Sequence, residues 1–424
     1  MNTIDVSIII VNYKTPQLTI NCVNSIIKQT EQVAYEIIIV DNSEDDEEFS
    51  ILEEELSGKV FKLLNTHKNI GFGKANNFGE KYSSGKNLFF LNSDTLLLNN
   101  SIYYLNQILN SSSEIGIVGG NLFTPNNKPW SSYVKNEYSL KQFKKMNSFW
   151  YFFVNKFIHR LDFNYSNHNI NINGCIIGAD LMIKKSVFEN LNGFDSRIFM
   201  YGEESLLCAK CRKKLGLKIL NVPMAKIMHF EGGSDTPVFS KTKIKNWILG
   251  ESIYFKTIYG DKSVNNFLKI SKKIYRKKFF FSKLVNLKNR ASNYRSFIKE
   301  ISNFQLEIKE KSSLKILVTG VKGQLGYDCI RELKERGYKN VLGIDRDEMD
   351  ITDEKSVMKF ITDYHPDVVM HNAAWTAVDK AEQMPDEVYK VNALGPKYVA
   401  EACKAVGATM FYISTDYVFD GKGT

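Results

Sequence analysis

Long apolar runs separated by amphipathic stretches dominate the first 260 residues. Runs rich in Ile, Val, Leu and Phe predict buried strands at 6–13, 35–43, 60–66, 86–94 and 115–123. After the first run, Thr15 and Pro16 stand where the N-cap and the first residue of a helix belong. Strands that are apolar on both faces and alternate with helices are typical of a parallel sheet covered on both sides, so we expect an α/β fold.

Polar residues follow these predicted strands, at the edge of the sheet where a ligand is expected. In open parallel sheets, ligands bind beyond the carboxyl ends of the strands. Acidic and imidazole side chains suited to metal and proton chemistry follow further along the chain. The resulting candidates are Asn12, Asp41, Asn76, Asn92, Asp94, Glu203, Glu204 and His229.

A second series of strands and helices begins at Leu314. The stretch "LKILVTGVKGQLG" places Gly320, Gly323 and Gly326 between a predicted strand and a helix, and Asp345 ends the next strand. In this context the glycines let a pyrophosphate approach the helix N-terminus, and the acid accepts a ribose hydroxyl. Arg346 is able to accept a 2′-phosphate, so both NADH and NADPH remain open. We expect domains at 1–260 and 313–424, joined by a segment at 261–312.

The joining segment is strongly basic. Between Lys262 and Lys299 there are 12 Lys and Arg residues and no Asp or Glu, which exceeds the net charge of +9 of the whole chain. Apolar and aromatic residues interleave with the charges. A solvated helical linker and an amphipathic segment on an anionic membrane surface explain this pattern about equally well. Nucleic acid ranks well below both, because no nucleic-acid-reading motif accompanies the charge, and we expect no such partner.

Composition places the chain in an ordinary globular class. Of its 424 residues, 43% are hydrophobic and 24% are charged. The six cysteines follow no disulfide pattern, so we expect reduced thiols and a cytoplasmic protein, or one peripheral at the inner face of the plasma membrane. "CAKC" at Cys208–Cys211 lacks further zinc ligands and indicates two thiols one helical turn apart. The N-terminus shows no signal peptide.

Six strings in the first segment carry a family resemblance. In order they are "SIIIVNYKTP", "VDNS", "NIGFGKANNFG", "LNSDT", "NGFDSRIFMYGEES" and "HFEGGS". They span nearly all of residues 5–235 and resemble family-2 inverting glycosyltransferases of the GT-A fold, particularly the bacterial rhamnosyltransferase-like branch. The resemblance implies a Rossmann-like domain that uses Mg²⁺ or Mn²⁺. It also implies transfer of a sugar from a nucleotide donor to a saccharide or lipid-linked acceptor.

The same resemblance assigns roles on the donor side of the site. Asp94 matches the last position of the family's D-x-D metal motif, while Asn92 departs from its first position. His229 matches a late histidine near the metal or diphosphate, although a buried structural histidine would look the same. The residues implied to bind the donor nucleotide are Asn12, Asp41, Asn76, Asn92 and Asp94.

On the acceptor side, the resemblance points to the acidic pair in "YGEES". Inversion requires a base that removes the proton of the attacking hydroxyl. Glu204 matches this base, with Glu203 beside it, although the family more often carries Asp there. Acids in the first turn of a helix also stabilise its dipole, and both readings are compatible.

The second segment resembles dTDP-4-dehydrorhamnose reductase over residues 314–424. The strings are "VTGVKGQLG", "DEMDITD", "NAAWTAVDKAE", "VNALGPKYVAEAC" and "ISTDYVFDG", typical of a Rossmann domain of the extended short-chain dehydrogenase type. Cofactor contacts are implied for Gly320, Gly323, Gln324, Leu325, Gly326, Asp345, Asp350, Ile351, Ala373, Ala374 and Thr376. Thr415 matches the hydroxyl that binds the keto-sugar, with a catalytic role.

The Tyr-x-x-x-Lys pair that such reductases use for catalysis does not occur in residues 313–424. The resemblance places it past residue 424, so we expect a truncated domain that binds NADPH or NADH without reducing the sugar. Three functions follow. The first is a glycosyltransferase that uses dTDP-rhamnose, the donor suggested by the neighbouring segment. The others are a reductase within a longer chain and a non-catalytic sugar-nucleotide-binding protein.

Overall fold

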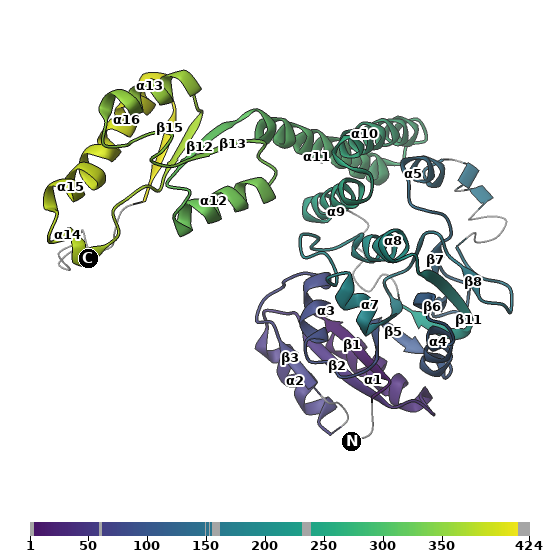
Figure 1. Cartoon of the computed structure of the whole chain (residues 1–424). Coiled ribbons are helices and arrows are strands. Elements are labelled where there is room, and N and C mark those ends of the chain that lie inside the picture. The colour runs from purple at the N-terminus through teal and green to yellow at the C-terminus, as the bar shows by residue number, and fades with distance from the viewer. Residues whose placement is uncertain are drawn as a thin grey trace. The chain divides into compact units, whose positions relative to one another are not determined.

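The computed structural model describes residues 4–58, 62–148, 150–151, 153–154, 162–230 and 239–413. The chain forms two compact units, Met1–Ile301 and Ser302–Thr424, and Figure 1 labels most of their elements. The sequence-based division at 260 and 312 stays a prediction.

A nine-stranded sheet is the centre of the first unit, in the order β3-β2-β1-β4-β10-β6-β11-β5 with β8 paired to β11. Strands β1 to β4 are parallel to one another, whereas β10 runs antiparallel between β4 and β6. The sheet is therefore mixed, rather than parallel throughout as the apolar runs predicted. The strands are β1 (Val6–Asn12), β2 (Tyr35–Asp41), β3 (Lys62–Asn65), β4 (Asn87–Asn92), β5 (Thr95–Leu97), β6 (Ile115–Phe123), β8 (Ile170–Asn171), β10 (Asp180–Lys184) and β11 (Lys218–His229).

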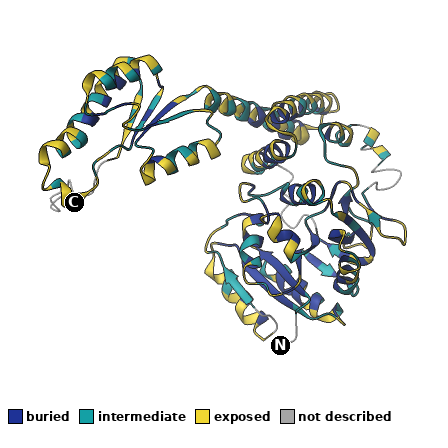
Figure 2. Cartoon of the chain, viewed as in Figure 1, coloured by how far each residue is buried: buried dark blue, intermediate teal, exposed yellow. Residues whose placement is uncertain are grey.

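Both faces of this sheet are buried. Successive side chains of a strand point to opposite faces, so each strand contributes to both apolar cores. Val6, Ile8 and Ile10 of β1 pack into one apolar core, and Ile9 and Val11 pack into the other. The first core is closed by α1 (Pro16–Gln29), α2 (Asp46–Leu56) and α4 (Ser101–Asn110), and the second by α3 (Phe72–Glu80), α7 (Lys185–Asn190) and α8 (Glu203–Leu215). Figure 2 shows the buried strands between helices whose outer faces are exposed.

The local sequence signals are found where they were predicted. Thr15 is the N-cap of α1 and Pro16 its first residue, although the Thr15 hydroxyl contacts Ser93 at 3.4 Å instead of capping the helix. Cys208 and Cys211 lie one turn apart on α8, and both are buried in the apolar core. All six cysteines are free thiols. Smaller elements of this unit are β7 (Tyr133–Val134), β9 (Cys175–Ile176) and α5 (Leu140–Met146).

Three long helices follow the sheet: α9 (Lys241–Tyr259), α10 (Asp261–Leu284) and α11 (Lys288–Ser313). The basic segment is thus helical. Aromatic rings hold α9, α10 and the first half of α11 together, since Trp247 contacts Phe267, Tyr275 and Phe297 within 6.0 Å between ring centroids. Among the described residues, no helix is both long enough and apolar enough to cross a membrane.

The second unit contains a four-stranded parallel sheet in the order β13-β12-β14-β15. Helices α13 and α16 pack together over one face, where Val357, Ile361, Val399 and Ala402 are buried. The elements are β12 (Lys315–Thr319), α12 (Gln324–Glu335), β13 (Asn340–Ile344), α13 (Glu354–Tyr364), β14 (Val368–His371), α14 (Val378–Ala381), α15 (Pro385–Tyr389), the short π-helix η1 (Lys390–Leu394), α16 (Gly395–Val406) and β15 (Thr409–Tyr412).

Candidate functional site

Strands β1 and β2 end together in a buried polar cluster. Asn12 and Asp41 are register partners with no exposed surface, and Asn12 Nδ2 donates to Asp41 Oδ1 at 2.8 Å. The Ser43 hydroxyl donates to the other carboxylate oxygen of Asp41 at 2.8 Å. Glu48 of α2, which the sequence did not single out, accepts from Asn12 at 3.3 Å and from the Lys14 amide at 2.9 Å. These bonds fix the orientation of the Asp41 carboxylate.

The glycine-rich turn that precedes α3 is tied to the chain just before α8. The Phe72 amide donates to the carbonyl of Phe199 at 3.0 Å. Gly71 has φ +88°, and a Cβ there would lie 2.5 Å from the same carbonyl oxygen, so this approach requires glycine. Asn77 forms two bonds with the backbone of Phe194, at 2.8 and 2.9 Å. Its neighbour Asn76 is buried and donates to the Phe72 carbonyl within α3, at 3.1 Å.

Asp94 and His229 meet although they are far apart in the sequence. Asp94 follows β4, His229 ends β11, and the pairing of β11 with the adjacent β5 places His229 opposite Thr95. As a result, His229 Nε2 lies 3.3 Å from Asp94 Oδ1. The Asp94 carbonyl also accepts from the Phe230 amide at 2.9 Å, which fixes the two chain segments side by side.

The donor set of this pair fits a divalent cation. The 3.3 Å separation of the oxygen and nitrogen is close to the ~3 Å expected of neighbouring ligands whose bonds to a cation are about 2.1 Å long. The Asp94 side chain is 26% exposed, so it is open to a ligand, whereas His229 is buried and its Nδ1 has no partner. The Oδ1 atom of the nearby Asn92 is also buried without a partner. No described group of three or more His, Cys, Asp or Glu side chains could hold a metal alone, so further ligands would have to come from a substrate.

The predicted acidic pair begins α8. Gly202 and Tyr201 before it have positive φ values of 96° and 78°, a conformation that is strained for tyrosine. Burial and the neighbouring charge of Glu204 raise the pKa of Glu203 to about 8. Burial also raises the pKa of Glu204, although backbone hydrogen bonds and the Ser205 hydroxyl oppose this effect. Both acids therefore hold protons more tightly than ordinary carboxyls.

The two acids point to different places. A Cβ on Gly178 would lie 3.5 Å from Glu204 Cγ, so the Glu204 side chain crosses the loop before β10. The next residue of that loop, Ala179, accepts from the Asn92 amide at 3.0 Å, which places Glu204 near the β4 end that carries Asp94. Glu203 lies instead against Gly73 and the start of α3. Of the two acids, Glu204 is the one that lies against the loop bonded to the end of β4.

Glu251 is a further buried acid that the sequence did not indicate. It lies on α9 and its Oε1 accepts from the Tyr138 hydroxyl at 3.0 Å, while Oε2 has no partner. Burial raises the pKa of Glu251 to about 8, and the charge of Glu204 contributes, while the Tyr138 bond works the other way. Nothing in the sequence distinguishes this residue from a surface acid of an amphipathic helix. Burial of its side chain and the influence of the Glu204 charge place it near the acidic pair of α8, and Glu203, Glu204 and Glu251 together form an acidic cluster.

In the second unit, backbone shape forms the candidate cofactor site. Gly320 has φ +70°, and a Cβ there would lie 2.8 Å from the backbone of Ala373 at the end of β14. A Cβ on Gly326 would lie 2.2 Å from the Gly320 carbonyl oxygen, so α12 begins directly against the turn. Gly323 is the N-cap of α12, and Gln324 and Leu325, its first residues, are exposed. The turn thus leaves the helix N-terminus open to an anion.

Asp345 holds this turn in place. Asp345 accepts from the amides of Lys322 and Arg346 at 2.9 and 2.8 Å. Burial works to raise the pKa of Asp345, but these two bonds and the Lys322 charge outweigh it and lower the pKa. Asp350 accepts from Thr352, and Ile351 packs against Gly395. Ala374 and Thr376 are exposed beyond β14, and Thr415 lies outside the described residues.

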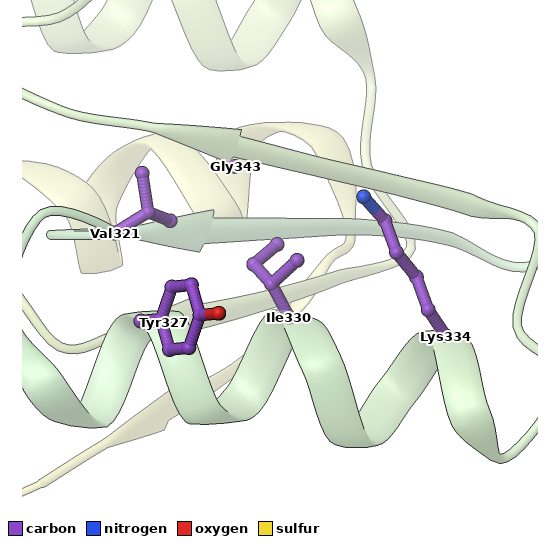
Figure 3. Close-up of a pocket in the computed structure, with 5 residues that line it drawn as sticks. All are labelled: Val321, Tyr327, Ile330, Lys334 and Gly343. Carbon is purple, nitrogen blue, oxygen red and sulfur yellow. The ribbon is translucent and has the colours of Figure 1, made fainter.

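A hollow of about 300 Å³ lies elsewhere in the second unit, along the flank of α12 (Figure 3). Tyr327, Ile330 and Lys334 of α12 line it together with Val321 and Gly343. It lies between α12 and β13 and reaches Val321 in the glycine turn, but none of the predicted cofactor residues lines it. We assign it no role.

Comparison with known proteins identifies the class of each unit. Residues 7–176 match the family model "Glycosyl transferase family 2", and residues 314–424 match "RmlD substrate binding domain". The chain therefore joins a family-2 glycosyltransferase domain with a GT-A-like α/β fold to a Rossmann-type segment. That segment is related to dTDP-4-dehydrorhamnose reductase. The sequence-based identification of the two families and the α/β fold class are confirmed, and the rhamnosyltransferase-like branch stays a prediction.

Individual relatives cover only parts of the chain. Spore coat polysaccharide biosynthesis protein SpsK of Bacillus subtilis is 44% identical over 110 residues, which are 26% of this chain and 38% of that protein. A crystal structure of dTDP-4-dehydrorhamnose reductase from Bacillus anthracis in complex with NADP is 39% identical, with a TM-score of 0.25. The match covers 26% of this chain and 39% of that one, so the chain spans well under half the length of these relatives. GalNAc-T7, in a structure with UDP, GalNAc and Mn²⁺, is 15% identical over 73% of this chain and 58% of its own, with a TM-score of 0.44.

Proposed function

We propose that the first unit is a metal-dependent inverting glycosyltransferase. The observation that carries the proposal is the 3.3 Å pairing of Asp94 with His229. The contact of Glu204 with Gly178, in the loop that is bonded to Asn92, supports its role as the base. In this proposal Asp94 and His229 hold Mg²⁺ or Mn²⁺, which neutralises the charge of the departing diphosphate. Glu204 removes the proton of the acceptor hydroxyl, and its raised pKa makes it a stronger base than an ordinary carboxylate.

The donor residues have complementary tasks in this proposal. Asp41 would accept a hydrogen bond from the nucleotide base, and the further donor contacts would be Asn12 beside it, Asn92 at the end of β4 and Asn76 on α3. Asp41 already accepts hydrogen bonds from two neighbours, which preorganises it before the donor arrives. A group held in this way loses little freedom when it binds.

We further propose that the donor is dTDP-rhamnose and that the acceptor is a growing polysaccharide or a lipid-linked saccharide. The support is that both units belong to one chain and that the second unit is related to dTDP-4-dehydrorhamnose reductase. Polysaccharide biosynthesis in the name of the Bacillus subtilis relative agrees with this acceptor class.

A panel of nucleotide sugars incubated with the full chain and Mn²⁺ or Mg²⁺ tests both proposals. Transfer or slow hydrolysis of dTDP-rhamnose is expected, and Asp94→Ala should abolish it. Asp46→Ala, an exposed acid on α2, is the matched control and should not change turnover. Turnover of a different donor would refute the rhamnose assignment alone. Donor binding without turnover of any donor would favour a non-catalytic binding protein.

A second candidate function concerns the second unit. The turn made by Gly320, Gly323 and Gly326 leaves a helix N-terminus free, which favours binding of NADPH or NADH as part of a dTDP-4-dehydrorhamnose reductase. The bound nicotinamide would supply hydride, and Thr415 would hold the keto-sugar. Titration of the full chain with NADPH and with NADH, followed by calorimetry, tests this function. No heat of binding with either cofactor would contradict it.

A further inference from the structure

The end of the helical hairpin formed by α10 and α11 carries apolar side chains that the fold does not use. This hairpin tip comprises residues 280–287. Its large apolar side chains are between 40% and 68% exposed: Phe280, Phe281, Leu284, Val285 and Leu287. An apolar cluster of this size, gathered in eight consecutive residues, differs from the scattered exposed apolar residues of ordinary surfaces.

These side chains are not needed for packing of the hairpin. The buried face of α10 is formed by Val264, Phe267, Leu268 and Tyr275, and it packs on α9 and α11. The tip residues lie outside this set. The apolar residues of the basic segment therefore divide into a core-facing group and a separate, exposed group.

The hairpin tip is a defined turn. Asn286 adopts the left-handed conformation with φ +55°, and the Leu287 amide donates to the Ser282 carbonyl at 2.8 Å. The Asn286 amide donates to the Lys283 carbonyl at 3.2 Å. This pair of bonds is the Schellman arrangement that ends a helix, and α11 starts directly after it. The turn therefore presents its apolar side chains in a fixed arrangement.

Cations occur along both helices that lead to the tip. The exposed basic residues of α10 and the first half of α11 are Lys262, Lys269, Lys273, Arg276, Lys277, Lys283, Lys288, Arg290, Arg295 and Lys299. No acid occurs between Lys262 and Lys299, and none of these ten side chains has an ion pair with a described residue. Lys278, in contrast, turns inward and donates to Asn147 at 2.7 Å. The chain soon after Asn147 carries Trp150, which is 68% exposed.

We propose that the hairpin tip inserts into the interface of an anionic lipid bilayer, with the cations of α10 and α11 on the headgroups. The exposed apolar side chains of the tip suit the apolar part of the bilayer interface, and the basic residues of the two helices suit its anionic headgroups. A second copy of the chain fits poorly, because two surfaces of the same charge would repel one another. Nucleic acid would bind the cations and stack on the aromatic rings, but it would not account for the exposed aliphatic Leu284, Val285 and Leu287. The inference goes beyond sugar transfer and does not depend on which donor is used.

Vesicle flotation with the full chain tests the inference. Binding to phosphatidylcholine vesicles that contain phosphatidylglycerol is expected, with weak binding to phosphatidylcholine alone and loss at high salt. The triple variant Phe280→Ser, Phe281→Ser, Leu284→Ser should reduce the partition coefficient about tenfold or more. Each of Lys283→Gln and Lys288→Gln should reduce it about fivefold on anionic vesicles.

Leu306→Ser is the matched control, because Leu306 is 58% exposed on α11 outside the tip and should not affect binding. All substituted residues are exposed, so circular dichroism and thermal unfolding should be unchanged. Equal flotation of the triple variant and the original chain would overturn the proposal. A dimer of the original chain that dissociates in the triple variant would also overturn it. So would binding to a single-stranded oligonucleotide that is lost in the lysine variants and kept in the triple variant.

Discussion

The strand ends of the two units carry polar residues of different character. In the first unit, Asn12, Asp41 and Ser43 are buried and bonded to one another before any ligand is present. In the second, Gln324 and Thr376 are exposed and only the path of the backbone around Gly320 is fixed. A site that must move protons and hold a cation needs fixed side chains, whereas a pyrophosphate site needs mainly a free helix N-terminus.

The same difference separates the ways in which each site should fail. Side-chain changes in the first unit should remove chemistry and leave the fold, because isosteric replacements keep the packing. In the second unit, glycine changes should disturb the fold and the site together, since a Cβ meets the backbone itself.

The largest expected effect is that of Glu204→Gln. Removal of a general base of this kind lowers the rate of transfer about 100- to 10,000-fold. Donor affinity should stay the same, as measured by calorimetry with the same preparation. Glu203→Gln is the matched control, with a smaller loss, because Glu203 lies toward α3. If Glu203→Gln were inactive and Glu204→Gln fully active, the base would be Glu203.

Gly320→Ala should have the next largest effect. Its left-handed φ costs an alanine about 1–2 kcal/mol, and crowding by the Ala373 backbone adds about 1–3 kcal/mol. Gly337→Ala is the control, with φ +90° and nothing within 4 Å of the added carbon, so it carries only the first cost. Hydrogen exchange of β12 and β14 measures the difference. Equal protection in the two variants would show that crowding at Ala373 is absent.

The acidic cluster of the first unit predicts a pH-dependent stability. Glu203 and Glu251 have pKa values raised by burial from 4.5 to about 8, so the folded state binds protons that the unfolded state releases. Their contribution is complete at acidic pH and is lost as the pH rises through about 8. Urea unfolding of the full chain from pH 5 to 9 should show this decline, and Glu203→Gln should make it shallower. An unchanged slope would contradict the burial of an ionisable Glu203.

The smallest effect is expected for His371, which is buried at the end of β14. Burial lowers the pKa of His371 from 6.5 to about 4, and its Nδ1 lies 2.8 Å from the Thr319 hydroxyl. A lowered pKa stabilises the fold above pH 6.5, and this contribution is lost as the pH falls toward 4. Hydrogen exchange should report local opening of β14 in this range, reduced in His371→Asn. Exchange that is independent of pH after correction for the chemical rate would argue against a neutral buried imidazole.

Much of the architecture could be predicted from apolar patterns, with instructive exceptions. β1, β2 and β4 were predicted from their continuous apolar runs. β10 was not, because Asp180 and Lys184 bracket only three apolar residues. Since that strand is antiparallel, its omission also explains why a wholly parallel sheet was expected.

Some site residues could likewise be found from local sequence patterns, whereas others depend on how distant parts of the chain pack together. Glycine turns and strand-end polar residues carry local signals, so Gly320 and Asp41 could be found in the sequence. The roles proposed for them remain predictions. The meeting of Asp94 with His229 requires the pairing of β5 with β11, which no local pattern encodes. The same is true of Glu251, whose burial depends on how α9 packs.

The hydrogen bonds between the glycine-rich turn and the segment before α8 couple the binding of the two substrates. The Phe72–Phe199 bond and the clamp of Asn77 on Phe194 connect the start of α3 to the chain that leads into Glu204. A donor that fixes the turn therefore also restricts the position of the proposed base. By thermodynamic linkage, an acceptor held at Glu204 should in turn strengthen donor binding. Each substrate would then lower the dissociation constant of the other.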